Sequence, residues 1–327
     1  MKKILFVGLG SIGQRHLQNA KKIFLNYNFY ALRETNHNNI IKNAKLIKKN
    51  SLKVTYNLKE VFYKLKDAIK LKPDIVFICN PTAKHLDTCI SFAKIKSHLF
   101  VEKPLGDNLK KYNILKNLIS KNRLITVVGY QTRFHPGIKF IKKIIDNKAY
   151  GKVISANFSF LTFLPNHHDY ENYKKTYVSV KKLGGGTSLN LSHEIDLIYH
   201  FFGMPTKVNS YKVNPKIINT ETEEDVHSML IFKDRSIVQL NLSYSSYIEQ
   251  RFIEIKFKNS FLKFDLITGK IFIFDRNKKF HNTFLCPKNN LFNDELKYFK
   301  DLLNGKIREN PLSIEKHQNI LKLIKKI

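Results

Sequence analysis

The segment Gly8-Leu9-Gly10-Ser11-Ile12-Gly13 constrains the fold of this chain more than any other part of its sequence. It follows a short apolar run at 4–7 that is typical of a β-strand, and it precedes a helical pattern at 16–23. Glycines at these three positions permit a tight turn, close approach of the backbone to a pyrophosphate, and close packing of helix on strand. The helix N-terminus then offers N–H donors to phosphates. We therefore assign a dinucleotide to this turn, with the candidate contacts Gly8, Gly10, Ser11, Ile12 and Gly13. The alternative is a glycine-rich turn without a ligand.

The first 126 residues alternate between strand-like and helix-like segments. Residues 74–78 are nearly all apolar, as a strand covered on both faces requires, and a helical pattern (84–93) and a strand pattern (98–101) follow. Apolar residues at helical spacing also predict a helix over 58–71. This alternation indicates an α/β domain with a doubly wound parallel sheet, a Rossmann domain, over 1–126.

The pattern changes after about residue 150, where the chain becomes rich in strands. Strand patterns joined by short polar or glycine-containing turns occur at 152–160, 227–232, 237–243, 251–256, 261–264 and 271–274. This spacing predicts an antiparallel meander, followed by helices over 292–303 and 313–327, the last with Ser313 as its N-cap. We expect a second, α+β domain with an open, mainly antiparallel sheet over 127–327.

The second predicted strand ends at Arg33 and Glu34, about twenty residues after Gly13. An acidic side chain at this place holds the ribose 2′-hydroxyl of NAD, whereas an arginine accepts the 2′-phosphate of NADP. The chain offers both, so these candidate contacts predict NAD or NADP without choosing between them. Either side chain is also compatible with a solvated surface.

Two further motifs follow predicted strands, at the carboxyl edge of the sheet where ligands sit. The first is CNPTAKH at 79–85, with Asn80, Pro81, Thr82 and His85 as candidate cofactor contacts. Thr82 is also a candidate N-cap of the following helix.

The second motif is VEKPL at 101–105, with Glu102 and Lys103 as candidate cofactor contacts. Lys103 precedes Pro104, which restricts it to an extended conformation and so fixes its direction. Composition alone gives this lysine little weight, because lysines are abundant along the whole chain.

A glycine run at 184–186 leads into a predicted helix that carries Asn190 and His193. Near-helical spacing puts both side chains on one face, and a histidine that titrates near neutral pH is suited to general acid–base catalysis. A lone histidine on such a helix is more often structural.

The sequence contains no pattern of a metal site, a disulfide framework or a membrane segment. The group His167-His168-Asp169, with His193 and Glu194, matches no zinc-ligand spacing, and none of the three cysteines lies in a CxxC pair. An odd, sparse set of cysteines fits a reducing compartment. The N-terminus lacks the apolar run of a signal peptide, and no run approaches the roughly 18 apolar residues of a membrane span. We expect a cytoplasmic protein with neither a bound metal nor a membrane partner.

The formal net charge of +31 first suggests a nucleic-acid partner. Only eight of the 57 basic residues are arginines, however, and the lysines are spread along the chain instead of forming one stripe. Asparagine and isoleucine are also abundant, a mixture typical of an AT-rich genome. We therefore expect no nucleic-acid partner, and a positive field that steers anionic small molecules towards the protein.

Taken in order along the chain, these motifs resemble those of the glucose–fructose oxidoreductase / inositol dehydrogenase / MocA (Gfo/Idh/MocA) family. The matching segments are GLGSIGQRH at 8–16, CNPTAKH at 79–85, VEKPLG at 101–106, GYQTRFHP at 129–136, LPNHHDYENY at 164–173 and GGGTSLNLSHEIDL at 184–197. Beyond about residue 200 only the strand-rich pattern agrees.

The resemblance implies a Rossmann domain and a C-terminal α+β domain whose open sheet often serves for homo-oligomerisation, here as a dimer or tetramer. It also implies hydride transfer between NAD(P) and a hydroxyl-bearing carbon of a carbohydrate, which is a sugar, a nucleotide-sugar or an inositol. The family's EKP lysine, beside the nicotinamide and the substrate hydroxyl, corresponds to Lys103, and its acid–base histidine corresponds to His193. Asn190 stands where a carboxylate is common, and an amide cannot take a proton at neutral pH.

The expected substrate contacts are Arg133, Tyr170, Tyr173, Asn190 and His193. Two other functions stay open. One is an enzyme that uses a tightly held dinucleotide in a transient oxidation, for instance to cleave glycosidic bonds. The other is a non-catalytic NAD(P)-binding regulator, for which the amide of Asn190 leaves room and against which Lys103 and His193 argue.

Overall fold

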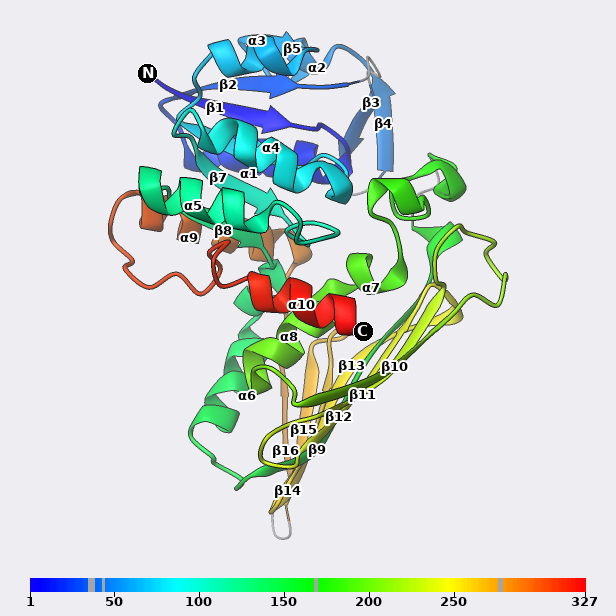
Figure 1. Ribbon diagram of the computed structural model, residues 1–327. Helices are drawn as coiled ribbons and strands as arrows, with labels where there is room; N and C mark the ends of the chain where they lie inside the picture. Colours follow the sequence, from blue (N-terminus) through cyan, green and yellow to red (C-terminus); the bar gives the residue numbers. More distant parts are fainter. Residues whose placement is uncertain (35–38, 43–44, 168–169, 276–278) are drawn as a thin grey trace.

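The first sheet has six strands, all parallel, and follows the alternation that the sequence predicts (Figure 1). In the computed structural model, which describes residues 1–34, 39–42, 45–167, 170–275 and 279–327, the strand order is β5-β2-β1-β6-β7-β8. The strands are β1 (Lys2–Val7), β2 (Tyr27–Leu32), β5 (Glu60–Phe62), β6 (Ile75–Ile78), β7 (His98–Glu102) and β8 (Thr126–Gly129). Parallel pairing brings the carboxyl ends of β1, β6 and β7 to one edge, where three of the sequence motifs begin.

Helices cover both faces of this sheet. On one face α1 (Ser11–Ile23) and α9 (Lys288–Leu303) pack together, and on the other lie α4 (His85–Ala93) and α5 (Tyr112–Asn122) (Figure 1). All four residues of β6 are apolar and buried, which is the pattern of a strand covered from both sides.

The helix predicted over 58–71 is wrong. Its first half contains β5, which pairs with the end of β2, and only Leu65–Lys70 is helical (α3). The apolar residues at 58, 61 and 62 fit helical spacing, but pairing with the edge of the sheet satisfies the backbone, with Leu58 buried and Val61 and Phe62 partly buried. Short elements fill the rest of this region: β3 (Asn39–Lys42), β4 (Lys45–Lys49) and α2 (Leu52–Thr55).

The second sheet has eight strands in the order β10-β11-β12-β9-β13-β14-β15-β16. They are β9 (Val153–Phe163), β10 (Lys207–Val213), β11 (Asp225–Ile231), β12 (Ile237–Ser243), β13 (Ser245–Phe257), β14 (Ser260–Asp265), β15 (Lys270–Asp275) and β16 (Lys279–Thr283). Neighbouring strands are antiparallel except β9 and β12. One face is covered by helices, including α6 (Pro136–Asp146) and α8 (Ser192–Phe202), and the other face is open (Figure 1).

The chain crosses between the two sheets more than once. A turn, η2 (Gln131–Phe134), leads from β8 into α6, and α9 later returns to pack on α1 of the first domain. The segment after α9 is also held there, because Asn310 donates a hydrogen bond to the carbonyl O of Thr126 at 2.7 Å. The predicted boundary at 126/127 therefore places α9 in the second domain, whereas its packing partner lies in the first.

The last helix, α10 (Gln318–Lys326), begins five residues later than predicted. Ser313 does not cap it; the carbonyl O of Ser313 accepts a hydrogen bond from Nδ1 of His317 at 2.7 Å within the preceding turn. Within the described part of the chain, no helix is long and apolar enough to cross a membrane.

Candidate active site

The glycine-rich turn between β1 and α1 has the geometry that its sequence predicts. Gly8 has φ +90°, and a Cβ on it would lie 2.7 Å from the carbonyl O of Cys79. A Cβ on Gly13 would lie 2.2 Å from the carbonyl O of Gly8, so a larger residue would push α1 away from the turn. A Cβ on Gly10, by contrast, would meet nothing within 4 Å, because open space lies over this backbone at the N-terminus of α1. The turn therefore fits a dinucleotide pyrophosphate, to which Ser11 and Ile12 would offer backbone N–H donors.

Arg33 and Glu34 lie directly after β2 and differ in exposure. Arg33 is buried, and burial lowers the pKa of its guanidinium. Glu34 is exposed, and its two carboxylate oxygens accept hydrogen bonds from Nζ of Lys84 at 2.6 and 2.5 Å. A guanidinium for a 2′-phosphate and a carboxylate for a 2′-hydroxyl are thus both present at this strand end.

The CNPTAKH segment forms the turn after β6, but two of its predicted cofactor contacts bind the protein itself. Asn80 donates from Nδ2 to Oγ1 of Thr88 at 2.9 Å. His85 is buried, and its ring nitrogens lie 2.9 Å from the carbonyl O of Pro104 and 2.8 Å from that of Asn80. Thr82 begins a 3-10 turn and caps no helix. His85 therefore joins this turn to the EKP turn, and its role as a cofactor contact stays a prediction.

Glu102, another predicted cofactor contact, points into the first domain. Its Oε1 lies 2.5 Å from Nε2 of His16 on α1, and its Oε2 accepts the backbone N–H of Lys103 at 3.2 Å. Burial alone would raise the pKa of Glu102, but the hydrogen bond and charge of His16, together with Lys103, hold that pKa below its usual value. The pair ties α1 to the strand end that carries Lys103, so the geometry gives Glu102 a positioning role.

Lys103 reaches from the first domain to the second. Its Nζ donates to the backbone O of Asn190 at 2.5 Å. Burial lowers the pKa of this ammonium, while the carboxylates of Glu102 and Glu194 oppose that shift. The lysine of the first domain is therefore held at the turn that precedes α8 of the second.

Asn190 and His193 lie on two helices instead of the single helix that the spacing predicts. The first, α7 (Thr187–Asn190), ends at Asn190, and α8 begins two residues later, at Ser192. The side-chain amide of Asn190 donates to the carbonyl O of Gly186 at 2.9 Å, so it is engaged within its own helix. His193 is buried, with its ring edge-on to Tyr130 at a centroid distance of 5.6 Å. The contact of Lys103 with Asn190 thus brings both predicted catalytic residues to the same junction of α7 and α8.

A buried ion pair beside His193 joins this site. Oε1 of Glu194 lies 2.6 Å from Nε of Arg251 on β13, whose guanidinium also covers the ring of Phe160. Burial raises the pKa of Glu194, and the charges of Arg251 and Lys103 oppose this shift. Glu194 carries one sequence signal, its place next to His193, but Arg251 stands 57 residues further on, in a strand without a motif.

Arg133, a predicted substrate contact, is engaged in a structural ion pair. Its Nε and Nη2 donate to the two carboxylate oxygens of Asp196 on α8 at 2.8 and 2.6 Å. The two side chains are 9% and 1% exposed, which leaves the guanidinium little surface for a ligand. This bidentate pair holds η2 against α8, and the predicted substrate contact of Arg133 stays a prediction.

Tyr170 and Tyr173, two predicted substrate contacts, lie in the segment after β9. The hydroxyl of Tyr173 donates to the backbone O of Ile218 at 3.0 Å. Burial raises the pKa of Tyr170, and the nearby side chains of Ser11 and Arg15 oppose that shift, so Tyr170 lies beside the glycine-rich turn at the cofactor side of the site. His168 and Asp169, which precede Tyr170, lie outside the described residues.

Both halves of this arrangement match one family. Residues 2–130 match the model of an oxidoreductase family with an NAD-binding Rossmann fold, and residues 138–260 match the GFO/IDH/MocA C-terminal domain. The chain belongs to the Gfo/Idh/MocA family. The fold class predicted from the motifs, a Rossmann domain followed by a mainly antiparallel sheet, is therefore confirmed.

Among Gfo/Idh/MocA relatives, the chain is 26% identical to myo-inositol 2-dehydrogenase of Thermotoga maritima over 202 residues, which are 62% of this chain and 55% of that protein. It is 24% identical to oxidoreductase P35 of Formosa agariphila, over 60% of each chain. The matches thus span about half to 60% of the length of these relatives.

Levoglucosan dehydrogenase, solved with NADH and levoglucosan, shares the fold at a TM-score of 0.80 with 15% identity, over 100% of this chain and 95% of that one. UDP-N-acetylglucosamine 3-dehydrogenase of Acidithiobacillus ferrooxidans shares the fold at a TM-score of 0.78 with 14% identity, over 99% of this chain and 96% of that one.

Proposed function

We propose that this Gfo/Idh/MocA protein moves a hydride between NAD(P) and a hydroxyl-bearing carbon of a sugar, a nucleotide-sugar or an inositol. The observation that carries the proposal is the 2.5 Å contact between Nζ of Lys103 and the backbone O of Asn190. It brings the lysine of one domain to the helix junction that presents His193 from the other. The relatives named for inositol, levoglucosan and UDP-N-acetylglucosamine support this substrate class.

The residues of this chain position the reactants and handle the proton, while the nicotinamide, when bound, supplies the hydride chemistry. In the direction of oxidation, His193 takes the proton of the substrate hydroxyl. The ammonium of Lys103 stabilises the negative charge that develops on the same oxygen. Asn190 takes no part in proton transfer, because an amide does not titrate near neutral pH and its Nδ2 is bound to Gly186.

Charged neighbours keep Lys103 suited to this role in spite of its burial. Burial favours the neutral amine and lowers the pKa of Lys103, and the charge of Arg251 adds to that shift, whereas the carboxylates of Glu102 and Glu194 oppose it. Both carboxylates are themselves anchored, Glu102 by His16 and Glu194 by Arg251. The ammonium is therefore held by fixed charges before a substrate arrives, which is the condition for electrostatic stabilisation at low reorganisation cost.

The test is a search for NAD(P)H formation, by its absorbance, with inositols, free sugars and nucleotide-sugars and with each cofactor in turn. On the substrate found, Lys103→Ala and His193→Ala should each lower kcat by at least about 100-fold while leaving NAD(P) binding in place. The matched control, Lys110→Ala, removes an exposed lysine of the same domain and should keep wild-type turnover.

Three results would count against the proposal. Near-wild-type turnover in either alanine variant would remove the assigned roles. Binding of NAD(P) without turnover on any member of the panel would favour a non-catalytic regulator. A dinucleotide that co-purifies tightly, with product formed but no net NAD(P)H, would favour a transient oxidation instead.

We also propose that copies of this chain associate through the open face of the second sheet. Large apolar side chains are exposed on this face, and they include Tyr211, Met229, Phe261, Phe272 and Phe274. The strand register places Met229 and Phe272 at the two ends of one row across the sheet, and the residues between them are polar: Gln239, Asn157, Glu254 and Lys263. Exposed apolar surface gathered on one face is typical of an interaction site.

A further inference from the structure

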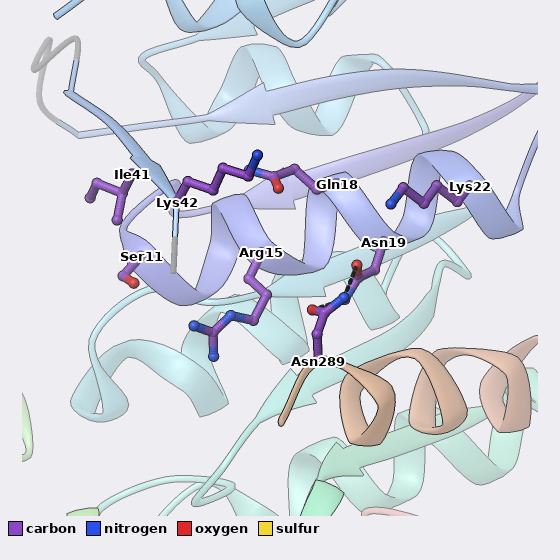
Figure 2. A pocket seen from close by; sticks show the side chains of 8 residues that line it. All are labelled: Ser11, Arg15, Gln18, Asn19, Lys22, Ile41, Lys42 and Asn289. Carbon is purple, nitrogen blue, oxygen red and sulfur yellow. Dashed lines mark hydrogen bonds between the residues drawn. The ribbon is translucent and has the colours of Figure 1, made fainter. Parts of the chain in front are cut away.

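A cavity of about 300 Å³ lies along α1 (Figure 2), and neither Lys103 nor His193 is among the residues that line it. It is lined by Ser11, Arg15, Gln18, Asn19, Lys22, Ile41, Lys42 and Asn289. Three of these side chains are cationic, four carry hydroxyl or amide groups, and none is a carboxylate. A volume of this size is at the lower end of the range for small-molecule sites.

Hydrogen bonds fix the two walls of the cavity. On one side, the side chain of Gln14 donates to the carbonyl O of Asn39 at 2.8 Å and accepts the N–H of Ile41 at 2.9 Å, which holds β3 on α1. On the other side, the amides of Asn19 and Asn289 bind each other reciprocally, at 3.1 and 3.3 Å. The cavity is therefore a built recess between three elements.

Arg15 is the cation that distinguishes this recess from the general lysine-rich surface. Arginines make up only eight of the 57 basic residues, and this guanidinium lies 4.8 Å from the ring centroid of Phe292. Burial lowers its pKa, and the charge of Glu102 opposes that shift from a distance. Among the described residues no hydrogen bond or ion pair engages Arg15, Lys22 or Lys42. Figure 2 shows Lys42 reaching over α1 towards Gln18, and Arg15 leaving the helix on the side of Asn289.

We propose that this cavity binds a small anion with a phosphate group, either inorganic phosphate or a phosphate monoester. The planar guanidinium of Arg15 matches the fork geometry of phosphate oxygens, and its partial burial strengthens that pairing. The two lysines add point charges, and Ser11 and the amide side chains add hydrogen-bonding groups.

The position of the cavity separates it from the dinucleotide site. The cavity runs along α1 from Ser11 to Lys22, which is about 16 Å along a helix axis. That direction leads away from the carboxyl edge of the sheet, where the glycine-rich turn receives the pyrophosphate. The two sites share only the first turn of α1, so the anion site does not depend on the proposed hydride transfer.

The experiment is calorimetric titration of the full chain with inorganic phosphate and, separately, with glycerol 3-phosphate, each without NADH and with saturating NADH. We expect one anion bound per chain. Arg15→Gln should weaken binding at least about tenfold, because it removes a charge-assisted pair. The double variant Lys22→Gln/Lys42→Gln should weaken anion binding several-fold. Two controls remove exposed charges elsewhere and should bind the anion as wild type does: Arg308→Gln and Lys116→Gln/Lys121→Gln. Tighter binding of glycerol 3-phosphate assigns the site to a phosphorylated metabolite, and tighter binding of phosphate assigns it to the free ion.

Three outcomes would overturn the proposal. Loss of binding once NADH is present would place the anion in the dinucleotide turn. If the control variants weaken anion binding as much as Arg15→Gln does, the effect comes from net charge alone. If anion binding does not saturate, the cavity is not a binding site. Since Arg15 also packs on Phe292, circular dichroism must show that Arg15→Gln is folded. If it is not folded, the anion affinity of Lys22→Gln/Lys42→Gln tests the proposal instead.

Discussion

Arg133 and Asp196 form a buried pair whose removal separates a structural role from a substrate-binding role. Burial raises the pKa of Asp196, and the guanidinium of Arg133 opposes this shift through its charge and its hydrogen bonds. Arg133→Met leaves the carboxyl group buried without that partner, so it should lower the free energy of unfolding by about 3–5 kcal/mol. Urea denaturation measures this loss. The KM of the folded fraction for its carbohydrate should stay near the wild-type value.

The double variant Arg133→Met/Asp196→Leu is the control for this prediction. It replaces both charges by apolar groups, so most of the lost stability should return. A large rise in KM with little change in stability would instead restore Arg133 as a substrate contact.

Residues whose role depends only on the local backbone were predictable from the sequence, and residues whose role depends on a distant partner were not. Glycine is required at Gly8 and Gly13 because backbone atoms of other residues lie within 3 Å of the place where a Cβ would be. The GxGxxG motif predicts this requirement from the sequence alone. Glu102 lies in an equally clear motif, yet its carboxylate turns inward to His16, 86 residues earlier. The pairing of Glu194 with Arg251 was missed for the same reason.

At the scale of helices and strands, the alternation of types was predictable and the ends were not. A three-residue strand such as Glu60–Phe62 carries too few residues to show a period of two, so the helical spacing around it prevailed. The break at Leu191 between α7 and α8 contains no glycine or proline, so the sequence carries no signal that predicts the end of a helix there. It matters for the site, because the backbone O of Asn190 at this break accepts the hydrogen bond from Lys103.

Helix α9 carries a buried carboxyl group, Glu295, that should make stability depend on pH. Neither of its oxygens has a hydrogen-bond partner among the described residues. Burial, followed by repulsion from Glu102 and Asp196, holds its pKa well above the usual value. Because the pKa is raised in the folded state, the stabilising contribution is complete below the pKa of the unfolded chain and is lost as pH rises through the folded-state pKa.

Glu295→Gln should remove this dependence. The difference in unfolding free energy between the variant and wild type should grow in favour of the variant by up to about 1.4 kcal/mol per pH unit above about pH 5, until Glu295 ionises in the folded protein. Urea denaturation at several pH values measures the difference, and Glu309→Gln, an exposed glutamate after α9, is the control. Parallel curves for wild type and Glu295→Gln would contradict the prediction.

For the whole molecule, the two-part architecture followed from the switch between helix–strand alternation and an antiparallel meander, because each pattern requires its own kind of sheet. The return of α9 to the first domain could not be predicted from the sequence. A helix pattern shows that one face is apolar, but it does not show which surface packs against that face. Contacts such as that of Phe77 with Phe299 on α9 close the first core with residues from the far end of the chain.

Salt should strengthen the association of copies of this chain, because the net charge of +31 opposes contact between copies whereas the exposed apolar side chains of the open sheet face favour it. Light scattering should find a dimer or tetramer that persists to lower protein concentration as ionic strength rises and the repulsion is screened. Phe261→Lys/Phe272→Lys should be monomeric, and Leu25→Lys, at an exposed leucine of the first domain, should assemble as wild type. A wild-type chain that stays monomeric at every salt concentration would exclude the proposed interface. Binding to duplex DNA has the opposite salt dependence, since it releases counterions. Duplex binding at low salt that is lost as salt rises would therefore show that the charge serves a nucleic-acid partner after all.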